Sequence, residues 1–587
     1  MTRASSIRLL LLSLACVFIG GAMAVAAKIL LWTIAAIANL AFFHRLAAGE
    51  APLAAHALGA WVIAVPAAGG LLVGLMARFG SRAIQGHGIP EAMEQVLLNG
   101  SRIPAKILAL KPLSTCLVIG TGGPFGAEGV VIATGGALGS VAGQSFELSA
   151  VERKTLLAAG AAAGLSAAFA CPIAAVLLAV ELLLFEFHAR SIIPVALASA
   201  AAAAVRVPLL GAGPMFSVPA MPGASGAASL AGYIALGAFS GALAILVVRV
   251  VHEAETLFER VPIHWMWKPA LGGLGVGLIG WFEPRVFGPG YGDIQSLLSG
   301  GLSTAEAGRL GLLKLAAWVI GVSSATSSGT LAPLLLIGSS GGVLVSTAFR
   351  GLLDPRVAAL AGMAAFFGGM SGAFLASVIL AFEATYQPAV VMPLLAAGAA
   401  SFLVSRIFSR ENIMTQKFVR QGLAVPSGLT ANPLEFVHVC EVSLPAQVLA
   451  DASVDAATLK AFLAEEGRDF DAGWLPSADK KGLFAGWLRL AALARESAPA
   501  RPIADLLERT GAVVAEDATL LEAARRMIEQ DVDRLAVLSH DEPGKLIGVI
   551  TQREIVAAYS HEELVASAPR GPKLRFLGAR RQSKRSA

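Results

Sequence analysis

A single carboxylate, Glu128, lies in a glycine-rich stretch from residue 120 to residue 139 of a very apolar chain. An ionisable group at membrane depth is costly unless it faces a cavity or a partner, so such a group indicates function. The glycines allow the backbone to approach a ligand closely, and they also interrupt helices. Broken helices inside a membrane protein direct backbone amides and positive helix ends at an ion. The stretch therefore predicts an ion site beside an acidic group.

Three glycine-containing breaks each precede an apolar, helix-like run. They are Gly86-His-Gly-Ile-Pro90, Gly126-Ala-Glu-Gly-Val130 and Gly329-Thr-Leu-Ala-Pro333. Each break places unpaired N–H groups and the positive end of a helix in the membrane interior. Three helix ends that converge, each with a partial positive charge, can bind an anion without a fully charged cation. Such a site suits permeation, because the ion must be able both to enter and to leave.

The composition predicts a polytopic membrane protein. Of 587 residues, 56% are hydrophobic and 14% are charged, and the mean hydropathy is +0.70, whereas soluble domains carry about 25% charged residues. The apolar run from Leu9 to Phe43 exceeds the roughly 20 residues that span a bilayer and predicts a first membrane helix. The four cysteines have neither disulfide nor metal spacing. We expect no cofactor, and no enzyme, because no nucleophile and base set or metal cluster lies near the breaks.

The apolar part of the chain contains an internal repeat. Three glycines recur 203 positions later: Gly126, Gly135 and Gly139 as Gly329, Gly338 and Gly342. The segment 172–181 recurs 202 positions later as 374–383, and both copies end in glutamate. Repeats with matched helix breaks are typical of transport folds whose site lies where the repeats meet. We expect repeats at about 1–206 and 227–421, separated by a Pro/Gly-rich stretch.

The chain changes character near residue 422, where charged residues become frequent. Beyond this point, capping boxes at Thr519-Leu-Leu-Glu522 and Thr551-Gln-Arg-Glu554, with apolar runs at 535–538 and 546–550, predict helices that alternate with strands. The expected divisions are a membrane domain over 1–421, a linker over 422–435, a degenerate first module over 436–495, a second module over 500–563 and a basic tail over 564–587.

This ordered set of motifs resembles the CLC family of chloride channels and transporters. The set comprises the three breaks, the stretch 161–169, and Lys111, which lies 17 residues before Glu128. The likeness covers residues 1 to about 421, and the two modules that follow resemble a pair of CBS domains. The resemblance implies an all-α polytopic membrane protein of two inverted-topology repeats with broken helices, followed by a cytoplasmic α/β CBS pair. It also implies a homodimer with one anion pathway in each subunit.

In this resemblance Glu128 corresponds to the gating glutamate, and Lys111 supplies electrostatic support. Amides and helix ends favour the ionised carboxylate, while desolvation and an adjacent bound anion favour the neutral form. Acid should therefore open the pathway. The residues that the resemblance places on the anion pathway are His87, Gly88, Ile89, Gly126, Ala127, Gly129, Thr330, Leu331, Ala332 and Met414.

Five positions depart from the family pattern. His87 replaces a serine that coordinates the central anion, and Met414 replaces a tyrosine opposite it. Leu182 stands where proton-coupled members often carry a second carboxylate, and an apolar side chain cannot relay a proton. Ala127 replaces a basic residue, and Leu331 replaces a phenylalanine. Anion binding here would depend mainly on backbone amides.

His87 supports two interpretations. It either coordinates the anion through a ring N–H and carries charge near neutral pH, or it packs across the cavity and only narrows the inner pathway. We favour the second interpretation.

The CBS resemblance implies adenine nucleotide as a partner, with Thr551 and Glu554 at the ribose-binding positions. Capping alone also explains Glu554, so we favour a dimerising or gating domain over a nucleotide site.

Together these patterns favour a CLC-type anion channel with voltage-gated chloride channel activity. It would pass chloride or similar small anions passively. We expect membrane lipid around it and no nucleic-acid partner. A bacterial inner membrane is expected, with the CBS domain and both termini in the cytoplasm. A proton-coupled anion exchanger of the same fold is the alternative. A membrane sensor that signals through the CBS pair is a third hypothesis.

Overall fold

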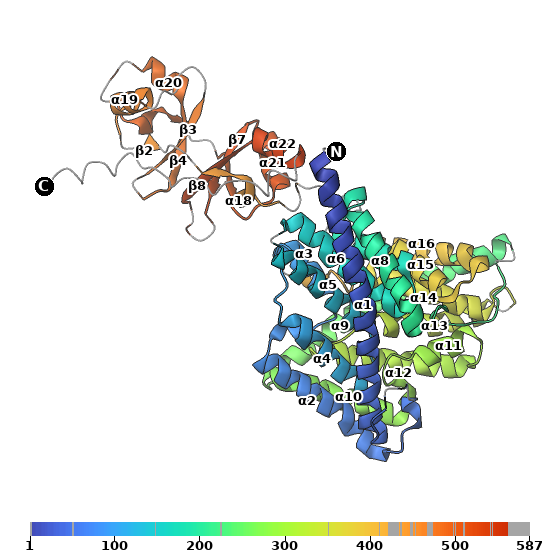
Figure 1. The fold of residues 1–587 in the computed structure, drawn as a ribbon. Coiled ribbons are helices and arrows are strands. Elements are labelled where there is room, and N and C mark those ends of the chain that lie inside the picture. The colour runs from blue at the N-terminus through green and yellow to red at the C-terminus, as the bar shows by residue number, and fades with distance from the viewer. Residues whose placement is uncertain are drawn as a thin grey trace. The chain divides into compact units, whose positions relative to one another are not determined.

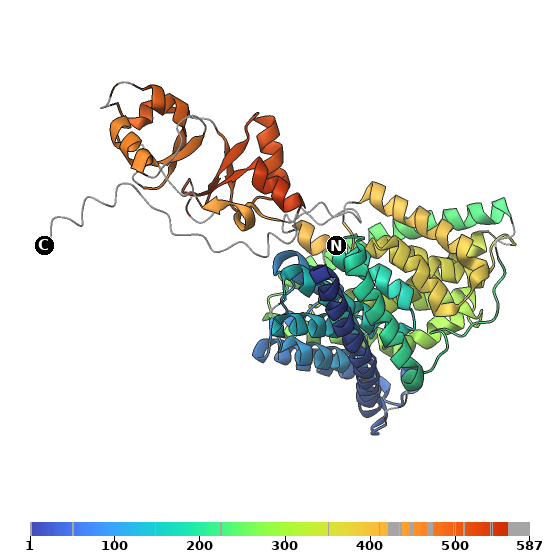
Figure 2. The ribbon, with the colours of Figure 1, turned by 45° about the horizontal axis from the view of Figure 1, so that its top comes forward.

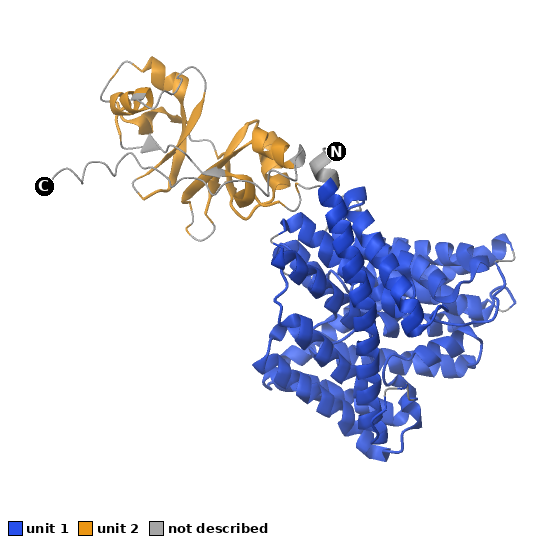
Figure 3. Ribbon diagram, viewed as in Figure 1, with its two compact units in different colours: residues 1–430 blue, residues 431–587 orange. Residues whose placement is uncertain are grey.

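The computed structural model forms two compact units, Met1–Thr430 and Ala431–Ala587 (Figure 3). It describes residues 3–420 apart from 48, 50, 51, 147, 224, 225, 350 and 410. Beyond residue 433 it describes 434–560 apart from 435–436, 446–449, 452–453, 466–472, 480, 497, 499–500, 509–510, 540–541 and 543. The basic tail and most of the expected linker lie outside the described residues.

The first unit is helical and consists of two matched sets of helices (Figures 1 and 2). The first set comprises α1 (Arg3–Phe43), α2 (Ala64–Phe79), α3 (Ile89–Leu98), α4 (Ile107–Gly120), α5 (Glu128–Ser145), α6 (Ala150–Phe169), α7 (Pro172–Ala179) and α8 (Ala189–Leu210). The second comprises α9 (Ala227–Arg260), α10 (Lys268–Phe282), α11 (Tyr291–Leu298), α12 (Thr304–Ser323), α13 (Leu331–Ala348), α14 (Pro355–Ser371), α15 (Phe374–Thr385) and α16 (Val391–Phe408). The short α17 (Gln416–Arg420) follows.

The two sets confirm the repeat, and α7 and α15 show how the repeats are related. Glu181, beyond α7, accepts the first-turn amides of α15 at 3.0 and 2.9 Å. Glu383, near the end of α15, accepts the first-turn amides of α7 at 3.0 and 2.8 Å. Each helix therefore has its positive end beside the other's last turn, so these equivalent helices run antiparallel. This is the relation expected of inverted repeats.

The recurring glycines of α5 and α13 serve helix packing. A Cβ on Gly135 would lie 2.0 Å from the carbonyl oxygen of Gly160 in α6, and a Cβ on Gly160 would lie 2.0 Å from that of Gly135. Gly338 and Gly362 make the same mutual contact between α13 and α14, at 2.6 and 2.4 Å. Backbones that approach this closely exclude side chains from the contact, as is common between membrane helices.

Six helical segments of the described residues are long and apolar enough to cross a membrane. They are Ile7–Phe43, Gly59–Phe79, Ala189–Leu210, Ala227–Arg260, Leu331–Ala348 and Pro388–Phe408. The long α1 packs against α6 and α8 (Figures 1 and 2). Shorter apolar helices such as α4 and α7 complete the unit, in keeping with the interruptions read from the sequence.

The second unit is α/β, as the alternating pattern predicts. One sheet has the order β1 (Leu444–Pro445), β8 (Leu546–Thr551), β7 (Arg534–Leu538), β6 (Val513–Ala515). The other has the order β2 (Ala450–Asp451), β3 (Trp474–Ala478), β4 (Phe484–Arg489), β5 (Leu507–Glu508). The helices are α18 (Val439–Val442), α19 (Ala456–Glu465), α20 (Leu490–Arg495), α21 (Leu520–Glu529) and α22 (Gln552–Ser560).

The two modules exchange short segments, so the contiguous ranges 436–495 and 500–563 do not separate them in space. Strand β1 pairs with β8, and Val439 of α18 belongs to the core beneath that later sheet. Conversely, β5 pairs with β4, and Ile503 belongs to the core of the earlier sheet. Each module therefore buries apolar side chains from both halves of the unit.

Candidate functional site

The three sequence breaks come together at one junction of glycine backbones. A Cβ on Gly88 would lie 2.5 Å from the carbonyl oxygen of Gly129, and a Cβ on Gly129 would lie 2.7 Å from Cα of Gly329. Gly86 and Ser327 form an isolated parallel β-bridge across the two repeats. The N-terminal ends of α3, α5 and α13 therefore meet, and only glycine fits where they touch. Three positive helix ends face one region, as an anion site without a full cation requires.

Glu128 is the first residue of α5 and is fully buried at this junction. The hydroxyl of Tyr291 donates a hydrogen bond to its Oε1 at 2.9 Å. The backbone N–H of Ala127 donates to the same hydroxyl at 3.4 Å. Tyr291 is the first residue of α11, and its ring packs edge-on against Phe169, with the ring centroids 5.9 Å apart. Sequence reasoning missed Tyr291.

One signal for Tyr291 was present in the sequence. The break Gly288-Pro-Gly290 lies 202 residues after Gly86-His-Gly88, so it marks a fourth helix start related to the first by the repeat. Gly88 and Gly290 both have positive φ, 95° and 78°, which favours glycine at each N-cap.

Two buried lysines hold the loops before these paired helices. Lys111 Nζ donates to the carbonyl oxygens of Ile84 and Gly86, both at 2.8 Å. Lys314 Nζ donates to those of Val286 and Gly288, at 2.8 and 2.5 Å. Lys111 therefore fixes the backbone that carries His87. Sequence reasoning missed Lys314, although it lies 203 residues after Lys111.

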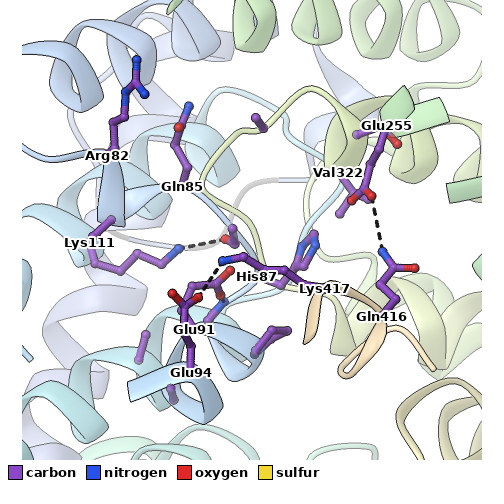
Figure 4. Close-up of a pocket in the computed structure, with 18 of the residues that line it drawn as sticks. Arg82, Gln85, His87, Glu91, Glu94, Lys111, Glu255, Val322, Gln416 and Lys417 are labelled. Atoms are coloured by element: carbon purple, nitrogen blue, oxygen red, sulfur yellow. Dashed lines mark hydrogen bonds and ion pairs between the residues drawn. The ribbon is translucent and has the colours of Figure 1, made fainter. Parts of the chain in front are cut away.

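A cavity of about 710 Å³ reaches this junction from one side (Figure 4). Its inner wall includes His87, Gly88 and Lys111, and Glu128 is not among its lining residues in the described part of the chain. Two ion pairs join α17 to other helices at the cavity: Lys417 with Glu94 at 2.6 Å and Arg420 with Glu255 at 3.2 Å. The cavity thus ends before the buried carboxylate.

His87 lies on the cavity wall and is held in place by the second repeat. Its Nδ1 lies 3.0 Å from the hydroxyl oxygen of Ser328, the residue before the third break. Which of the two atoms donates depends on the imidazole tautomer. This hydrogen bond fixes the ring where the cavity ends, a position consistent with either interpretation of His87.

The other predicted pathway residues occupy the junction or its surroundings. Buried residues at the three breaks are Ile89, Ala127, Leu331 and Ala332, with Thr330 as the N-cap of α13. The backbone N–H of Gly126 donates to the carbonyl oxygen of Gly329 at 3.4 Å. Met414 is buried and is not among the described residues that line the cavity, whereas its neighbour Ile413 is. The place of Met414 on the pathway stays a prediction.

Leu182 is buried in a π-helical turn, Val180–Leu184, at the end of α7. The carboxylate beside it, Glu181, is occupied in capping α15. In the second unit, the N–H and the hydroxyl of Thr551 both donate to Glu554 Oε2, the backbone bond at 2.9 Å. The capping box accounts for both polar side chains, and nucleotide binding by Thr551 and Glu554 stays a prediction.

Inverted helical repeats with broken helices that meet at a buried carboxylate define a membrane protein for ion permeation. Residues 68–406 match the family model described as voltage gated chloride channel, and residues 503–561 match the CBS domain model. The chain belongs to the CLC family of chloride channels and transporters. Members of this family are channels or transporters, not enzymes.

Relatives of this chain include bacterial and plant proteins. A ClcB-like protein of Ralstonia nicotianae is 26% identical over 376 residues, 62% of this chain and 87% of the relative. The voltage-gated ClC-type chloride channel ClcB of Escherichia coli O157:H7 is 28% identical over 359 residues, 60% of this chain and 85% of the relative. Chloride channel protein CLC-f of Arabidopsis thaliana is 28% identical over 378 residues, which is 59% of this chain but only 47% of the plant protein.

Solved structures share the fold. The crystal structure of a slow cyanobacterial Cl⁻/H⁺ antiporter has a TM-score of 0.61 and 22% identity, and the match covers 72% of this chain and 98% of that one. The structure of a eukaryotic CLC transporter has a TM-score of 0.62 and 18% identity, with 93% and 98% covered. At these identities the likeness establishes the fold alone.

Proposed function

We propose that the helical unit passes chloride or a similar small anion across a bacterial membrane, and that Glu128 closes the pathway. One observation carries the proposal: a fully buried carboxylate lies where three positive helix ends meet, just beyond a cavity that leads to them. The CLC family and the chloride channels among the relatives supply the class of ion.

The proposed mechanism is competition between a carboxylate and an anion for the same positive helix ends. While ionised, Glu128 takes the place that an anion would occupy at the start of α5. Protonation removes its charge, so the carboxyl group leaves the helix ends and an anion replaces it. The amides of α3, α5 and α13 hold the passing ion, and backbone donors bind it weakly enough to release it.

Passive permeation is the favoured mode because, among the described residues, only apolar side chains surround the gap between Glu128 and Leu182. A small gap lies between Ile132, one turn after Glu128, and Leu183, next to Leu182. It has no room for a water molecule, and the described residues around it are all apolar: Ile89, Ile132, Ala161, Ala162, Ala175, Leu178, Ala179 and Leu183. A proton relay needs hydroxyls, carboxylates or water, and the described residues around this gap offer none.

Proton-coupled exchange is the second candidate, and Glu186 favours it. This carboxylate is buried four residues after Leu182. It accepts a hydrogen bond from the hydroxyl of Ser191 at 2.6 Å, and Lys154 Nζ and His188 Nδ1 lie 3.9 and 3.8 Å from its other oxygen. A buried carboxylate beside an exposed imidazole can take up a proton from water, so Glu186 is the candidate proton acceptor if coupling exists.

Reconstituted liposomes distinguish the two modes. With a proton gradient and a chloride gradient, a channel gives a reversal potential that depends on chloride alone, whereas an exchanger gives one that shifts with the pH gradient. Glu128→Gln should give faster anion flux that has lost most of its dependence on external pH. An unchanged pH profile in Glu128→Gln would remove Glu128 from the gating role. Glu186→Gln should leave channel flux unchanged but should abolish proton movement in an exchanger.

The proposal includes a homodimer with the CBS pair and both termini in the cytoplasm. Helices α8 and α16 flank the paired α7 and α15 and expose apolar residues such as Leu197 and Leu403, which supports a continuous contact face. Light scattering of the purified protein in detergent tests the dimer. Calorimetry with ATP tests the CBS site, and absence of any anion flux would favour a membrane sensor.

A further inference from the structure

We infer that Tyr291 is a positioning residue whose hydroxyl holds the Glu128 carboxylate in the closed position and so sets the pH range over which the gate opens. The inference rests on the proposed gating role of Glu128. It adds a residue that belongs to the second repeat and lies 163 positions away in the chain. The contact joins the two repeats at the point where the anion must pass.

The direction of the hydrogen bond follows from the groups around the hydroxyl. The N–H of Ala127 donates to the Tyr291 oxygen at 3.4 Å, and the hydroxyl proton is directed at Glu128 Oε1, 2.9 Å away. A hydrogen bond from a hydroxyl is stronger when its acceptor is charged, so this bond stabilises the ionised carboxylate more than the protonated one. It therefore favours the closed gate.

The hydroxyl is held in place from two sides. The ring packs edge-on against Phe169 at an interplanar angle of 83°. The loop before α11 is fixed by Lys314, which donates to the carbonyl oxygens of Val286 and Gly288. A side chain held by packing and by a fixed backbone loses little freedom when it makes a hydrogen bond, so the contact is preorganised.

Few side chains from other helices act on the carboxylate. In the described part of the chain these are the neutral hydroxyl of Tyr291 on α11 and the charged ammonium of Lys314 on α12. The charge of Lys314 also interacts with Asp293 on α11. The α13 residues at the junction, Thr330 to Ala332, carry no titratable side chain. The backbone N–H of Ala332 on α13 also acts on the carboxylate. Removing the tyrosine hydroxyl therefore changes one of three polar influences from other helices and leaves the lysine and this amide in place.

Tyr291→Phe tests the inference because it deletes the hydroxyl and keeps the ring. Chloride efflux from liposomes that contain the full chain is measured against external pH. We expect the profile of Tyr291→Phe to move towards higher pH by about one unit, equivalent to about a tenfold change in the gate equilibrium. In a Glu128→Gln background the same change should have no effect on the profile. Tyr386→Phe, which alters an exposed tyrosine at the end of α15, is the matched control.

The outcomes separate this inference from the proposed function. If Glu128→Gln abolishes the pH dependence but Tyr291→Phe leaves the profile unshifted or moves it towards lower pH, the role of Tyr291 is wrong and the gate stands. If Glu128→Gln keeps the pH dependence, the gate itself is wrong. Phe169→Leu provides a second variant should Tyr291→Phe fold poorly. It loosens the ring but keeps the hydroxyl, and it should shift the profile in the same direction by less.

Discussion

The two repeats share a scaffold but differ in the residues that carry chemistry. Lys111 and Lys314 are equivalent, and each holds two carbonyl oxygens of the loop before a helix. By contrast, the position of Glu128 in α5 is held by Leu331 in α13, each being the first residue of its helix. Duplication thus supplies the converging helix ends, and divergence supplies the gate.

The hydroxyl partner of the gate comes from a second divergent position. Tyr291 begins α11, whereas Ile89 begins the equivalent α3. A perfectly symmetric junction would carry either two carboxylates or none. Placing the acid in one repeat and its hydroxyl donor in the other gives a single gate that both repeats control. His87, in the first repeat, lies at the junction on the side that faces the cavity. The equivalent position in the second repeat is Pro289.

The shared scaffold should be the feature most sensitive to substitution. Gly129→Ala places a Cβ 2.7 Å from Cα of Gly329 and 2.8 Å from the carbonyl oxygens of His87 and Ser328. Because these are backbone atoms, the junction must move, and we expect a loss of stability of about 3 kcal/mol together with loss of flux. Thermal unfolding in detergent and chloride efflux measure the two effects.

Gly136→Ala is the matched control in the same helix. Its new Cβ would lie 3.6 Å from the Leu157 side chain and 3.8 Å from the Leu157 carbonyl oxygen, which are ordinary van der Waals contacts. The change should be tolerated, since alanine favours helix over glycine by up to about 1 kcal/mol. Equal tolerance of Gly129→Ala and Gly136→Ala would show that the three helix ends are not packed as tightly as the structure indicates.

Much of the scaffold could be predicted from the sequence, because glycine spacing and a constant offset are local signals. The three breaks, the internal repeat and the helix starts at Thr519 and Thr551 were read in this way. The contact between Tyr291 and Glu128 could not be predicted, because it depends on how two distant helix ends meet. Lys314 was within reach, since the same offset leads to it from Lys111.

The exchange of strands between the CBS modules left no readable signal. Strands β1 and β5 contain two residues each, which is too short to show alternation. Their pairing with β8 and β4 depends on how the folded unit brings distant segments together. Contiguous modules were therefore the simplest expectation from sequence, and the pairing of β1 with β8 and of β5 with β4 crosses those bounds.

The two lysines test whether the repeats are equivalent in energy as well as in geometry. Lys111→Met and Lys314→Met each remove the ammonium donor from two carbonyl oxygens, of which that of Gly86 keeps the N–H of Ser328 at 3.0 Å. Relief from burying a charge partly offsets this cost. We expect each to lower the unfolding free energy by about 2 kcal/mol, with similar values for the two variants. Chemical unfolding in detergent measures the difference.

Function should separate the two lysine variants where stability does not. Lys314→Met loosens the loop that carries Tyr291 and should shift the pH dependence of flux, whereas Lys111→Met should change only its magnitude. If only one of the two variants lowered the unfolding free energy, the two lysines would not contribute equally to stability.

The smallest expected effect concerns His87, whose equivalent position in the second repeat is Pro289 and which lies where the cavity ends. If the ring only narrows the pathway, His87→Ala should raise chloride flux at every pH by about threefold, less than 1 kcal/mol in barrier, because the helix-end amides remain. Ser328→Ala removes the hydroxyl that holds the ring and should raise flux by less. Gln95→Ala, on the wall of the same cavity, should leave flux unchanged.

The opposite interpretation of His87 makes a distinct prediction. An imidazolium that coordinates the anion would make His87→Ala lose flux, and the loss would be greatest at acid pH, where the ring is charged. His87→Ser gives an independent check, because a small hydroxyl donor replaces a large ring and should strengthen chloride binding in either case. Because the Ser328 hydroxyl already occupies Nδ1, we expect the widening result. If flux in His87→Ala fell selectively at acid pH, the His87 ring would be an anion ligand at the end of the cavity and not a constriction.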